Sequence, residues 1–542
     1  MCILMMLLML IPLLMSLSSI QYNSFYLMKI LLTKLFNMNI SIDIMMDWIS
    51  LFFLSTVMLI SSLIILFSKY YIPNKEQNQF MLMLLMFVLS MSILILSNNL
   101  FLMLLGWDGL GLSSYILVIY YQNYSSASSG TITLLSNRIG DILILLSMSL
   151  ITMSMNWNFN MNFEFSKTTM LLLLIAACSK SAQFPFSAWL PMAMAAPTPI
   201  SALVHSSTLV TAGVFIMLRI STSLHPLTMM ILLMISSSTA IYASMSANWE
   251  QDLKKIIALS TLSQIAMMMF AISMNSLVLA FMHLIIHALF KSAMFLCAGI
   301  MIHESSYQDM RMMGLNFSKS SLTLSMLGIN TLALMGIPFM SGFFSKDSII
   351  ENMMISTTNS LMSLLMIMSI GMTTTYSIRM AISSNKPFMK MIPISSNHQM
   401  ISNYIPIILL SMMAITSGSW LTWIFSSEQT FIMNNYTKFM ILVLLIMGFM
   451  LGLFLQFKSK KFMKFGFSSI PLWFIHIISV IPTNLFNPIM KIFQNNDKTW
   501  KEMYGPNKSN NLMMMYSYIP EKTKSTLMMI LIMTSILPMF FL

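Results

Sequence analysis

Residues 171–191, LLLLIAACSKSAQFPFSAWLP, place a lysine in the middle of an apolar run that prolines then interrupt. Nine apolar or small residues precede Lys180, so its ammonium group cannot easily reach water at a membrane surface. A charge at the centre of a membrane helix costs roughly 2.5–3.5 kcal/mol, and such residues usually have a function. Pro185 and Pro191 each remove a backbone donor, which is tolerated where the backbone faces protein or a water-filled cavity. This stretch predicts a broken transmembrane helix that holds a buried lysine.

The composition of the whole chain is that of a membrane protein. Of its 542 residues, 57% are hydrophobic and 8% are charged, and the mean hydropathy is +0.81. A soluble globular protein carries about 25% charged residues. These values exclude a soluble enzyme, a secreted disulfide scaffold and a nucleic-acid binder. The three cysteines have no metal-ligand spacing, so neither disulfides nor zinc are expected.

Long apolar runs follow one another along the chain. A helix needs ~20 apolar residues to cross the hydrocarbon layer, and alternating segments typical of a membrane β-barrel are absent. The predicted fold is therefore an all-α polytopic membrane protein with about fifteen transmembrane helices. The N-terminus has no basic start or cleavage site, so we expect a first span there and no transit peptide or signal sequence. The runs lie near 2–20, 45–68, 80–97, 99–121, 131–155, 169–190, 199–220, 227–247, 254–273, 275–302, 320–345, 358–382, 401–424, 439–457 and 525–542.

A second interrupted span lies in the run 320–345. Gly336, Pro338 and Gly342 come just before Lys346, so this span also combines a break with a lysine. Interrupted spans at matching places in two halves of a chain are typical of transporters built from inverted repeats. The sequence therefore predicts two inverted repeats, each with one broken helix.

Other ionisable residues accompany the two lysines in or at the ends of the predicted spans. His283, His287 and Lys291 are spaced i, i+4 and i+8, which places them on one face of a helix. Three polar groups in register are difficult to explain as packing alone. The full set of candidate site residues is Asp108, Arg138, Asp141, Lys180, His205, Lys254, Lys255, His283, His287, Lys291, Lys346 and Asp347.

Structural explanations stay open for some members of this set. Arg138 and Asp141 are three residues apart, so they can form an ion pair near the membrane surface. Lys254 and Lys255 open a span and can simply mark the membrane boundary. His205 is followed by hydroxyl residues and can be a hydrogen-bonded packing residue.

The residue types of the set are those of proton transfer. Burial weakens the hold of a lysine on its proton, and a nearby carboxylate strengthens it. Histidine exchanges protons near neutral pH. The sequence contains no phosphate-binding loop, metal-ligand cluster, haem ligand pair or nucleophile motif. It therefore predicts a protein that moves protons and takes the driving energy from elsewhere.

The basic residues are concentrated at the C-terminus. Residues 458–542 hold ten lysines and three acidic residues, so +7 of the net charge of +12 lies there. Positive loops are retained on the cytoplasmic or matrix side of a membrane. We expect the basic tail on that side, and part of it to form an amphipathic helix along the membrane. The segment 21–44 contains the stretch NMNISIDIMM, whose alternation of polar and β-branched residues predicts a short hairpin at the membrane surface.

Several motifs between residues 100 and 350 resemble one family very specifically. The sequence is similar to the chain 5 family of NADH–ubiquinone oxidoreductase, the distal antiporter-like subunit of respiratory complex I. The long tail supports chain 5, since the chain 2 and chain 4 relatives lack a lateral helix and final span. The matching segments are GWDGLGLSSY (106–115), SNRIGD (136–141), the run 180–213, DLKKIIALSTLSQ (252–264), HALFKSAMFLCAGIMIH (287–303) and MGIPFMSGFFSKD (335–347).

The resemblance assigns roles to the candidate residues. It implies a half-channel acid at Asp108, a broken-helix lysine at Lys180, a connecting histidine at His205 and an Arg–Asp pair at Arg138 and Asp141. It implies a central polar axis formed by Lys254 or Lys255, His283, His287 and Lys291. It implies a second broken-helix lysine at Lys346, with Asp347 beside it. The family acid is commonly Glu, so the shorter Asp108 puts direct pairing with Lys180 in doubt. Many members also have one more N-terminal helix than is expected here.

The domain boundaries follow from the spans and from the resemblance. They are N-terminal helices with a surface hairpin (1–97), an antiporter-like core of two inverted repeats (98–382, the second ending at about 424), C-terminal core helices (383–457), a basic segment with a lateral helix (458–524) and a terminal anchor (525–542).

The resemblance implies a proton-translocating subunit in the mitochondrial inner membrane, with the basic tail on the matrix side. It implies no cofactor in this chain, because partner subunits bind NADH, FMN, iron–sulfur clusters and ubiquinone. The expected partners are the other complex I subunits, chain 4 under the lateral helix, and phospholipids; no nucleic acid is expected. Two alternatives remain: the large subunit of a multi-subunit Na⁺/H⁺ antiporter, and a purely structural membrane-arm subunit.

Overall fold

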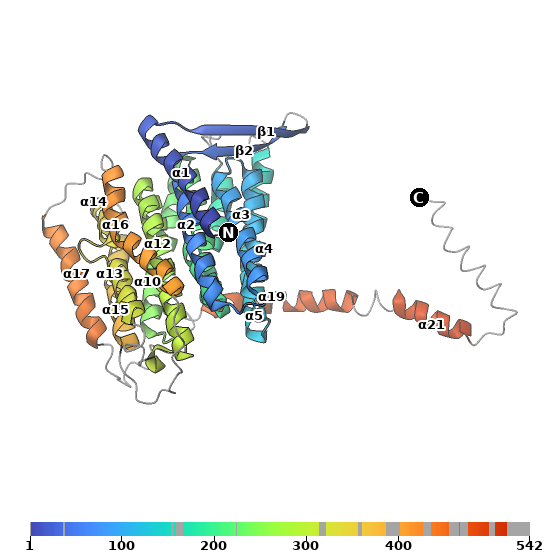
Figure 1. The fold of residues 1–542 in the computed structure, drawn as a ribbon. Helices are drawn as coiled ribbons and strands as arrows, with labels where there is room; N and C mark the ends of the chain where they lie inside the picture. Colours follow the sequence, from blue (N-terminus) through green and yellow to red (C-terminus); the bar gives the residue numbers. More distant parts are fainter. Residues whose placement is uncertain are drawn as a thin grey trace. The chain divides into compact units, whose positions relative to one another are not determined.

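The computed structural model describes residues 2–35, 38–152, 157–158, 166–223, 225–313, 321–355, 360–385, 401–425, 435–454, 466, 475–497 and 505–517. The chain divides into two compact units, residues 1–473 and 474–542. The first unit is a helical bundle, and the described part of the second consists of helices (Figure 1). The predicted terminal span at 525–542 lies outside the described residues.

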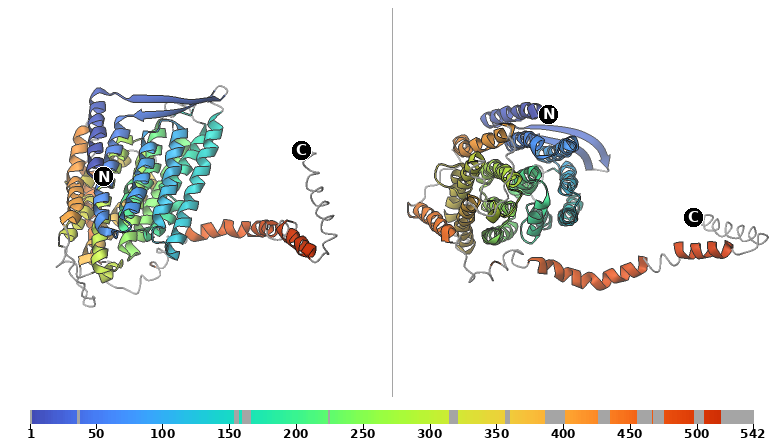
Figure 2. Two further views of the ribbon diagram at one scale, coloured as in Figure 1. Left: turned by 45° about the vertical axis from the view of Figure 1, so that its right-hand side comes forward. Right: turned by 60° about the horizontal axis from the view of Figure 1, so that its bottom comes forward.

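Most elements of the first unit are helices that run side by side across the bundle (Figure 2). Between the long helices lie short helical segments of three to eight residues, which mark the first break and the turns. The first-unit elements are α1 (Cys2–Tyr22), β1 (Tyr26–Leu35), β2 (Met38–Met46), α2 (Trp48–Tyr71), α3 (Gln77–Leu96), α4 (Leu100–Val118), α5 (Tyr124–Ile151), α6 (Lys167–Lys180), η2 (Phe186–Ala188), α7 (Trp189–Met192), η3 (Ala193–Ala195), α8 (Thr198–Ile200), η4 (Ser201–Thr208), α9 (Leu209–Ile220), η5 (Ser221–Ser223), α10 (Pro226–Trp249), α11 (Leu253–Ser273), α12 (Leu277–Ser305), η6 (Met310–Met312), α13 (Ser321–Met335), α14 (Ser341–Ile355), α15 (Ser360–Asn385), α16 (Ile401–Ile424) and α17 (Asn435–Phe454). The second unit contains α19 (Ile475–Asn495) and α21 (Pro506–Ser517).

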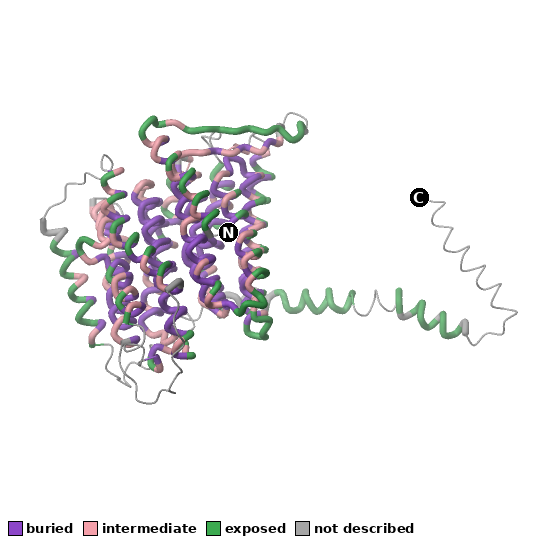
Figure 3. Tube along the Cα trace, in the orientation of Figure 1, coloured by how far each residue is buried: buried purple, intermediate pink, exposed green. Residues whose placement is uncertain are grey.

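Eleven helices of the described residues are long and apolar enough to cross a membrane. The predicted all-α membrane fold is therefore confirmed, whereas the count of about fifteen spans stays a prediction. The helix α3 presents an apolar face on the outside of the bundle, as expected for a helix in contact with lipid. Its residues Leu82, Met86, Leu89 and Ile93 are exposed and follow helical spacing. The helices α11 and α12 are instead buried on almost every side (Figure 3). They form the centre around which the other helices pack.

Residues 21–44 lie largely in an antiparallel hairpin of β1 and β2. The register runs from Tyr26 opposite Met46 to Leu35 opposite Met38. On β2, Ser41, Asp43 and Met45 are buried, because alternate residues of a strand share one face. The strand β2 packs against α2, α3 and α4, so the hairpin covers one end of these helices (Figure 1). We call this end of the bundle the hairpin face and the opposite end the far face.

Both predicted helix breaks are present. The helix α6 ends at Lys180, earlier than the predicted run to 190, and short helical segments follow it. The second break separates α13, which ends at Met335, from α14, which begins at Ser341 and continues beyond the predicted end at 345. Gly336 has a φ of +82°, a conformation that glycine adopts without steric cost. A Cβ on Gly342 would lie 1.9 Å from the Ala333 carbonyl oxygen, so only glycine permits this close approach of the two half-helices.

Candidate functional site

The first polar cluster surrounds Lys180 at the end of α6. The Lys180 side chain is fully buried, and its Nζ donates a 2.5 Å hydrogen bond to the Trp107 carbonyl oxygen. The same ammonium lies 3.9 Å from the centroid of the Trp107 ring, a cation–π contact. The Trp107 Nε1 in turn donates to Asp141 Oδ1 at 2.8 Å. Trp107 on α4 therefore connects the lysine of α6 with the carboxylate of α5.

The predicted acid Asp108 lies at the edge of this cluster. Its carboxylate is 4.0 Å from Arg138 Nη1, whereas Asp141 is closer to the same atom at 3.2 Å. In the described part of the chain, no ion pair within 4.0 Å joins Asp108 to Lys180. The structure thus brings the four charged residues into one cluster, in which Trp107 contacts both Lys180 and Asp141. Arg138 can exchange between two carboxylates.

Close packing of α5 on α6 positions Asp141 near Lys180. A Cβ on Gly140 would lie 2.2 Å from Ser179 Oγ, so the glycine lets α5 approach the last turn of α6. Ser179 directly precedes Lys180, and its carbonyl accepts a 3.0 Å hydrogen bond from Trp189 Nε1. This bond satisfies one of the carbonyls that a helix leaves unpaired where it ends. The lysine is therefore held on a rigid element, although the helix stops there.

His205 lies beyond the break, in the π-helical segment η4. It is buried, and neither ring nitrogen has a hydrogen-bond partner among the described residues. Its ring centroid is 6.3 Å from that of Trp189, the residue that also binds the end of α6. Segments of π-helix occur frequently at functional sites. The alternative explanation treated His205 as a hydrogen-bonded packing residue, but its side chain has no hydrogen bond to the part of the chain that the structure describes.

Lys254 and Lys255 point in different directions from the start of α11. The Lys254 side chain is buried, and its Nζ donates to the Ala196 carbonyl oxygen at 3.1 Å. Lys255 is 44% exposed and forms a 2.8 Å ion pair with Asp252. Both line a cavity of about 300 Å³ at the far face, together with Ser129 of α5. Lys254 therefore points into the bundle. The exposed position of Lys255 agrees with the alternative that this residue marks the membrane boundary.

The predicted stripe His283–His287–Lys291 lies on α12 and is fully buried. His283 has two neighbours within hydrogen-bond distance: its Nδ1 is 2.8 Å from Ser345 Oγ and its Nε2 is 3.2 Å from Gln264 Oε1. The His283 and His287 ring centroids are 6.4 Å apart. Lys291 donates to the Ser260 hydroxyl of α11. The polar groups of α12 therefore face α11 on one side and α14 on the other.

The second broken-helix lysine bridges its own break. The Lys346 side chain is buried, and its Nζ donates to the carbonyl of Leu334 in the last turn of α13. Ser345 directly precedes Lys346 and contacts His283, so α14 connects the break to the central stripe. Asp347 is the next residue and is partly buried. The arrangement resembles the first break, where a lysine also contacts a main-chain carbonyl.

Sequence reasoning missed several polar partners. Trp107, Gln264 and Ser345 each contact a candidate residue from another helix. It also missed an ion pair of 2.7 Å between Asp47 and Arg219, two mostly buried residues at the hairpin face. Trp107 directly precedes Asp108 and Ser345 directly precedes Lys346, and this adjacency to candidate residues could have identified them as polar partners. Nothing in the local sequence pairs Asp47 with Arg219.

The fold and the site define a polytopic membrane protein of the transporter class, with two lysine-bearing broken helices on either side of a buried polar stripe. The transmembrane family described as NADH:quinone oxidoreductase/Mrp antiporter matches residues 97–376. The family described as the NADH dehydrogenase subunit 5 C-terminus matches residues 376–542. The chain belongs to the NADH-ubiquinone oxidoreductase chain 5 family.

Relatives with this name are similar over most of their length. The chain is 40% identical over 515 residues to NADH-ubiquinone oxidoreductase chain 5 of Aedes aegypti, covering 90% of this chain and 88% of the relative. It is 39% identical to the chain 5 of Lumbricus terrestris, covering 95% and 93%. Among solved structures, a chain of the Mrp complex from Dietzia sp. DQ12-45-1b has a similar fold, with a TM-score of 0.74 at 20% identity. That match covers 96% of this chain and 58% of the Mrp chain.

Proposed function

We propose that this chain carries protons across the mitochondrial inner membrane as a membrane-arm subunit of NADH:ubiquinone oxidoreductase. The observation that carries the proposal is the fully buried Lys180, which contacts the carbonyl and the indole ring of Trp107, while the Trp107 Nε1 binds the Asp141 carboxylate. A cation in that position is costly unless it exchanges its charge in the course of function. The matching family descriptions supply the complex to which the chain belongs.

The chain's own residues provide the sites that protons occupy. In the first repeat, Arg138 can pair with Asp108 or with Asp141, and Asp141 binds Trp107 beside Lys180. A shift of Arg138 toward Asp108 leaves Asp141 free to stabilise a proton on Lys180, and the reverse shift favours its release. His205 and Lys254 continue from this cluster toward the stripe of α12. We propose that Lys346 and Asp347 form the corresponding site of the second repeat, and that Lys255 lies at the margin of the path.

Redox chemistry belongs to partner subunits in this proposal. NADH, FMN, iron–sulfur clusters and ubiquinone bind there, and this chain contributes proton sites alone. Among the described residues, no group of three or more His, Cys, Asp or Glu could hold a metal ion. The basic tail lies on the matrix side, where positive segments are retained.

The second unit supports a contact with a neighbour in the membrane arm. On α19, Phe486, Ile489, Met490 and Phe493 are exposed and follow the spacing of one helical face. We propose that this face packs on the neighbouring antiporter-like chain 4 and on phospholipids. The basic residues of the segment then face anionic lipid headgroups.

The proposed function predicts which complex the chain occupies. Solubilised in mild detergent and separated on a native gel, the chain is expected to co-migrate with a large assembly that oxidises NADH. Reconstituted in vesicles, that assembly should translocate protons when NADH and a quinone are supplied. A chain that migrates without NADH-oxidising activity and exchanges Na⁺ for protons would support the antiporter alternative, to which the Mrp fold similarity points.

Removal of residues 482–542 is expected to weaken assembly of the distal membrane arm, because it deletes the exposed apolar face of α19 and everything after it. The measurement is the fraction of fully assembled complex on a native gel. A shorter deletion of 525–542 serves as the matched control, since it leaves α19 and α21 in place. Normal assembly of the longer deletion contradicts the role proposed for the lateral helix.

A further inference from the structure

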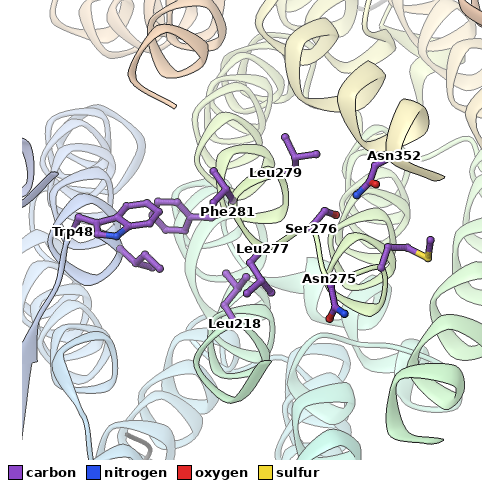
Figure 4. Close-up of a pocket in the computed structure, with 11 residues that line it drawn as sticks. Trp48, Leu218, Asn275, Ser276, Leu277, Leu279, Phe281 and Asn352 are labelled. Atoms are coloured by element: carbon purple, nitrogen blue, oxygen red, sulfur yellow. The ribbon is translucent and has the colours of Figure 1, made fainter. Parts of the chain in front are cut away.

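Two cavities of the first unit differ in the chemistry of their walls. One has a volume of about 520 Å³, and Asn275, Ser276 and Asn352 supply polar groups to it (Figure 4). The other has a volume of about 500 Å³ and is lined mostly by aliphatic, aromatic and methionine side chains. We call this second cavity the apolar groove. Buried water needs polar partners, so the apolar groove is suited to an apolar molecule.

The apolar groove lies between helices that face lipid. Its walls come from α1, α2, α12 and α16. On α1, which packs on α2, the exposed Leu14 directly follows the groove residue Leu13. On α16, the exposed Met412 directly precedes the groove residue Met413. The groove is therefore continuous with the lipid-facing surface of the bundle, and the bilayer is the source of a molecule that fills it.

The length of the apolar groove matches one leaflet of the bilayer. Trp423 lines it at the end of α16, which meets the start of α2 through the contact of Phe425 with Trp48. Leu59 lines it about 16 Å further along α2, at the rise of an α-helix. The hydrocarbon layer is ~30 Å thick, so one leaflet measures about 15 Å. An acyl chain therefore fits the groove in the orientation that it already has in the bilayer.

One polar group in the apolar groove lacks a partner. Ser417 is 8% exposed, and its Oγ has no hydrogen-bond partner among the described residues. A buried hydroxyl without a partner costs free energy, so Ser417 requires an acceptor from the molecule that fills the groove. The other hydroxyls that line the groove bond to carbonyls of their own helices; they belong to Ser55, Thr56, Thr416 and Ser419.

Two tryptophans relate Ser417 to the membrane surface. Trp420 and Trp423 are exposed near the end of α16, and tryptophan is enriched where the membrane meets water. Trp420 also contacts Phe52 of α2, with ring centroids 6.0 Å apart. Ser417 lies about one helical turn deeper than Trp420, at the level where the ester groups of a phospholipid meet the hydrocarbon layer. An ester carbonyl accepts a hydrogen bond, so it complements the Ser417 hydroxyl.

We propose that the apolar groove binds one acyl chain of a phospholipid from the leaflet at the hairpin face, and that Ser417 donates a hydrogen bond to the ester carbonyl of that lipid. The bound chain fills the space between α1 and α16 and so ties α1 to the bundle. This site is separate from the lipid contact proposed for α19, and it does not depend on the proposed proton-carrying function.

The occupant is tested by photolabelling of the assembled complex in phosphatidylcholine vesicles that contain phosphatidylcholine with a diazirine in its acyl chain. Labels are expected on the groove residues Met9 and Met413 and on the outward residue Leu14. When bulk lipid is washed away with detergent before irradiation, only the groove labels should remain. Loss of the groove labels together with the Leu14 label would show bulk lipid alone and overturn the proposal. Groove residues that stay unlabelled in both conditions would show that a protein helix covers the groove, which also overturns it.

A variant that fills the apolar groove tests the site itself. Leu13→Trp places a large side chain in the groove and is expected to abolish the label on Met413 that survives washing. Leu14→Trp is the matched control, because Leu14 is 65% exposed on the same helix and does not line the groove. Equal retention of the label in the two variants overturns the groove as the binding site.

The ester contact is tested by Ser417→Ala, which removes one hydroxyl and disturbs the fold little. The label that survives washing is expected to fall by about fivefold, the scale of one hydrogen bond. Ser419→Ala is the matched control and should keep the label, because the Ser419 hydroxyl also lines the groove but bonds to the Thr416 carbonyl. Equal labelling of the two serine variants overturns the proposed hydrogen bond.

Discussion

Replacement of Lys180 by methionine is expected to abolish most of the proton translocation that accompanies NADH oxidation, while leaving assembly of the complex largely intact. The side chain is fully buried and has a main-chain carbonyl and an indole ring as its close partners. Methionine has a similar length and fills the site without a charge, so packing changes little. Loss of a proton-exchanging group costs roughly 10²–10⁴ in rate where that group is essential. The measurement is proton translocation per NADH oxidised in vesicles.

The variant Lys180→Arg distinguishes the loss of a proton-exchanging group from the loss of a positive charge. A guanidinium stays protonated at all physiological pH values, so Lys180→Arg retains the cation without releasing a proton. We expect this variant to fail as methionine does. Lys69→Met is the matched control, because Lys69 is exposed in the last turn of α2 and lies outside the candidate set. Recovery of pumping by arginine would show that the site requires a fixed charge, and full activity of the methionine variant would remove Lys180 from the mechanism.

Replacement of Lys346 by methionine is expected to lower proton translocation to a similar extent, for a reason that includes the helix break. Lys346 donates to the carbonyl of Leu334, so it joins the end of α13 to the start of α14. Its neighbour Ser345 contacts His283, so a disturbed break also moves the central stripe. The variant removes both the proton site and this bridge. We therefore expect a larger loss of thermal stability than with Lys180→Met, measured as the unfolding temperature of the complex.

The matched control for this second variant is Ser348→Ala, half a turn further along α14. The Ser348 hydroxyl bonds to carbonyls of its own helix, so its loss tests damage to α14 that leaves the lysine in place. A Lys346→Met variant with normal proton-to-electron stoichiometry and rate would contradict the role of the second repeat.

The features that follow from local spacing were predicted well. Helical runs of apolar residues gave an all-α membrane protein, because each backbone group in lipid must bond within its own helix. The breaks next to Lys180 and Lys346 followed from proline and glycine, which act on the backbone at their own positions. The stripe of α12 followed from helix geometry. The extent of α14 and the early end of α6 were not predicted, since apolar composition does not mark where such helices stop.

The sequence by itself determined that this chain lies in a membrane, where its helices break, and which residues carry charge within them. Only the tertiary structure decided that Lys254 points inward and Lys255 outward, that Trp107 lies between Lys180 and Asp141, and which side chains face His283. The physical reason is the separation along the sequence over which each interaction acts. Helix periodicity acts over a few residues, whereas a hydrogen bond between helices depends on how the whole bundle packs. The pairing of Asp47 with Arg219, 172 residues apart, exists because α2 begins and α9 ends at the same face.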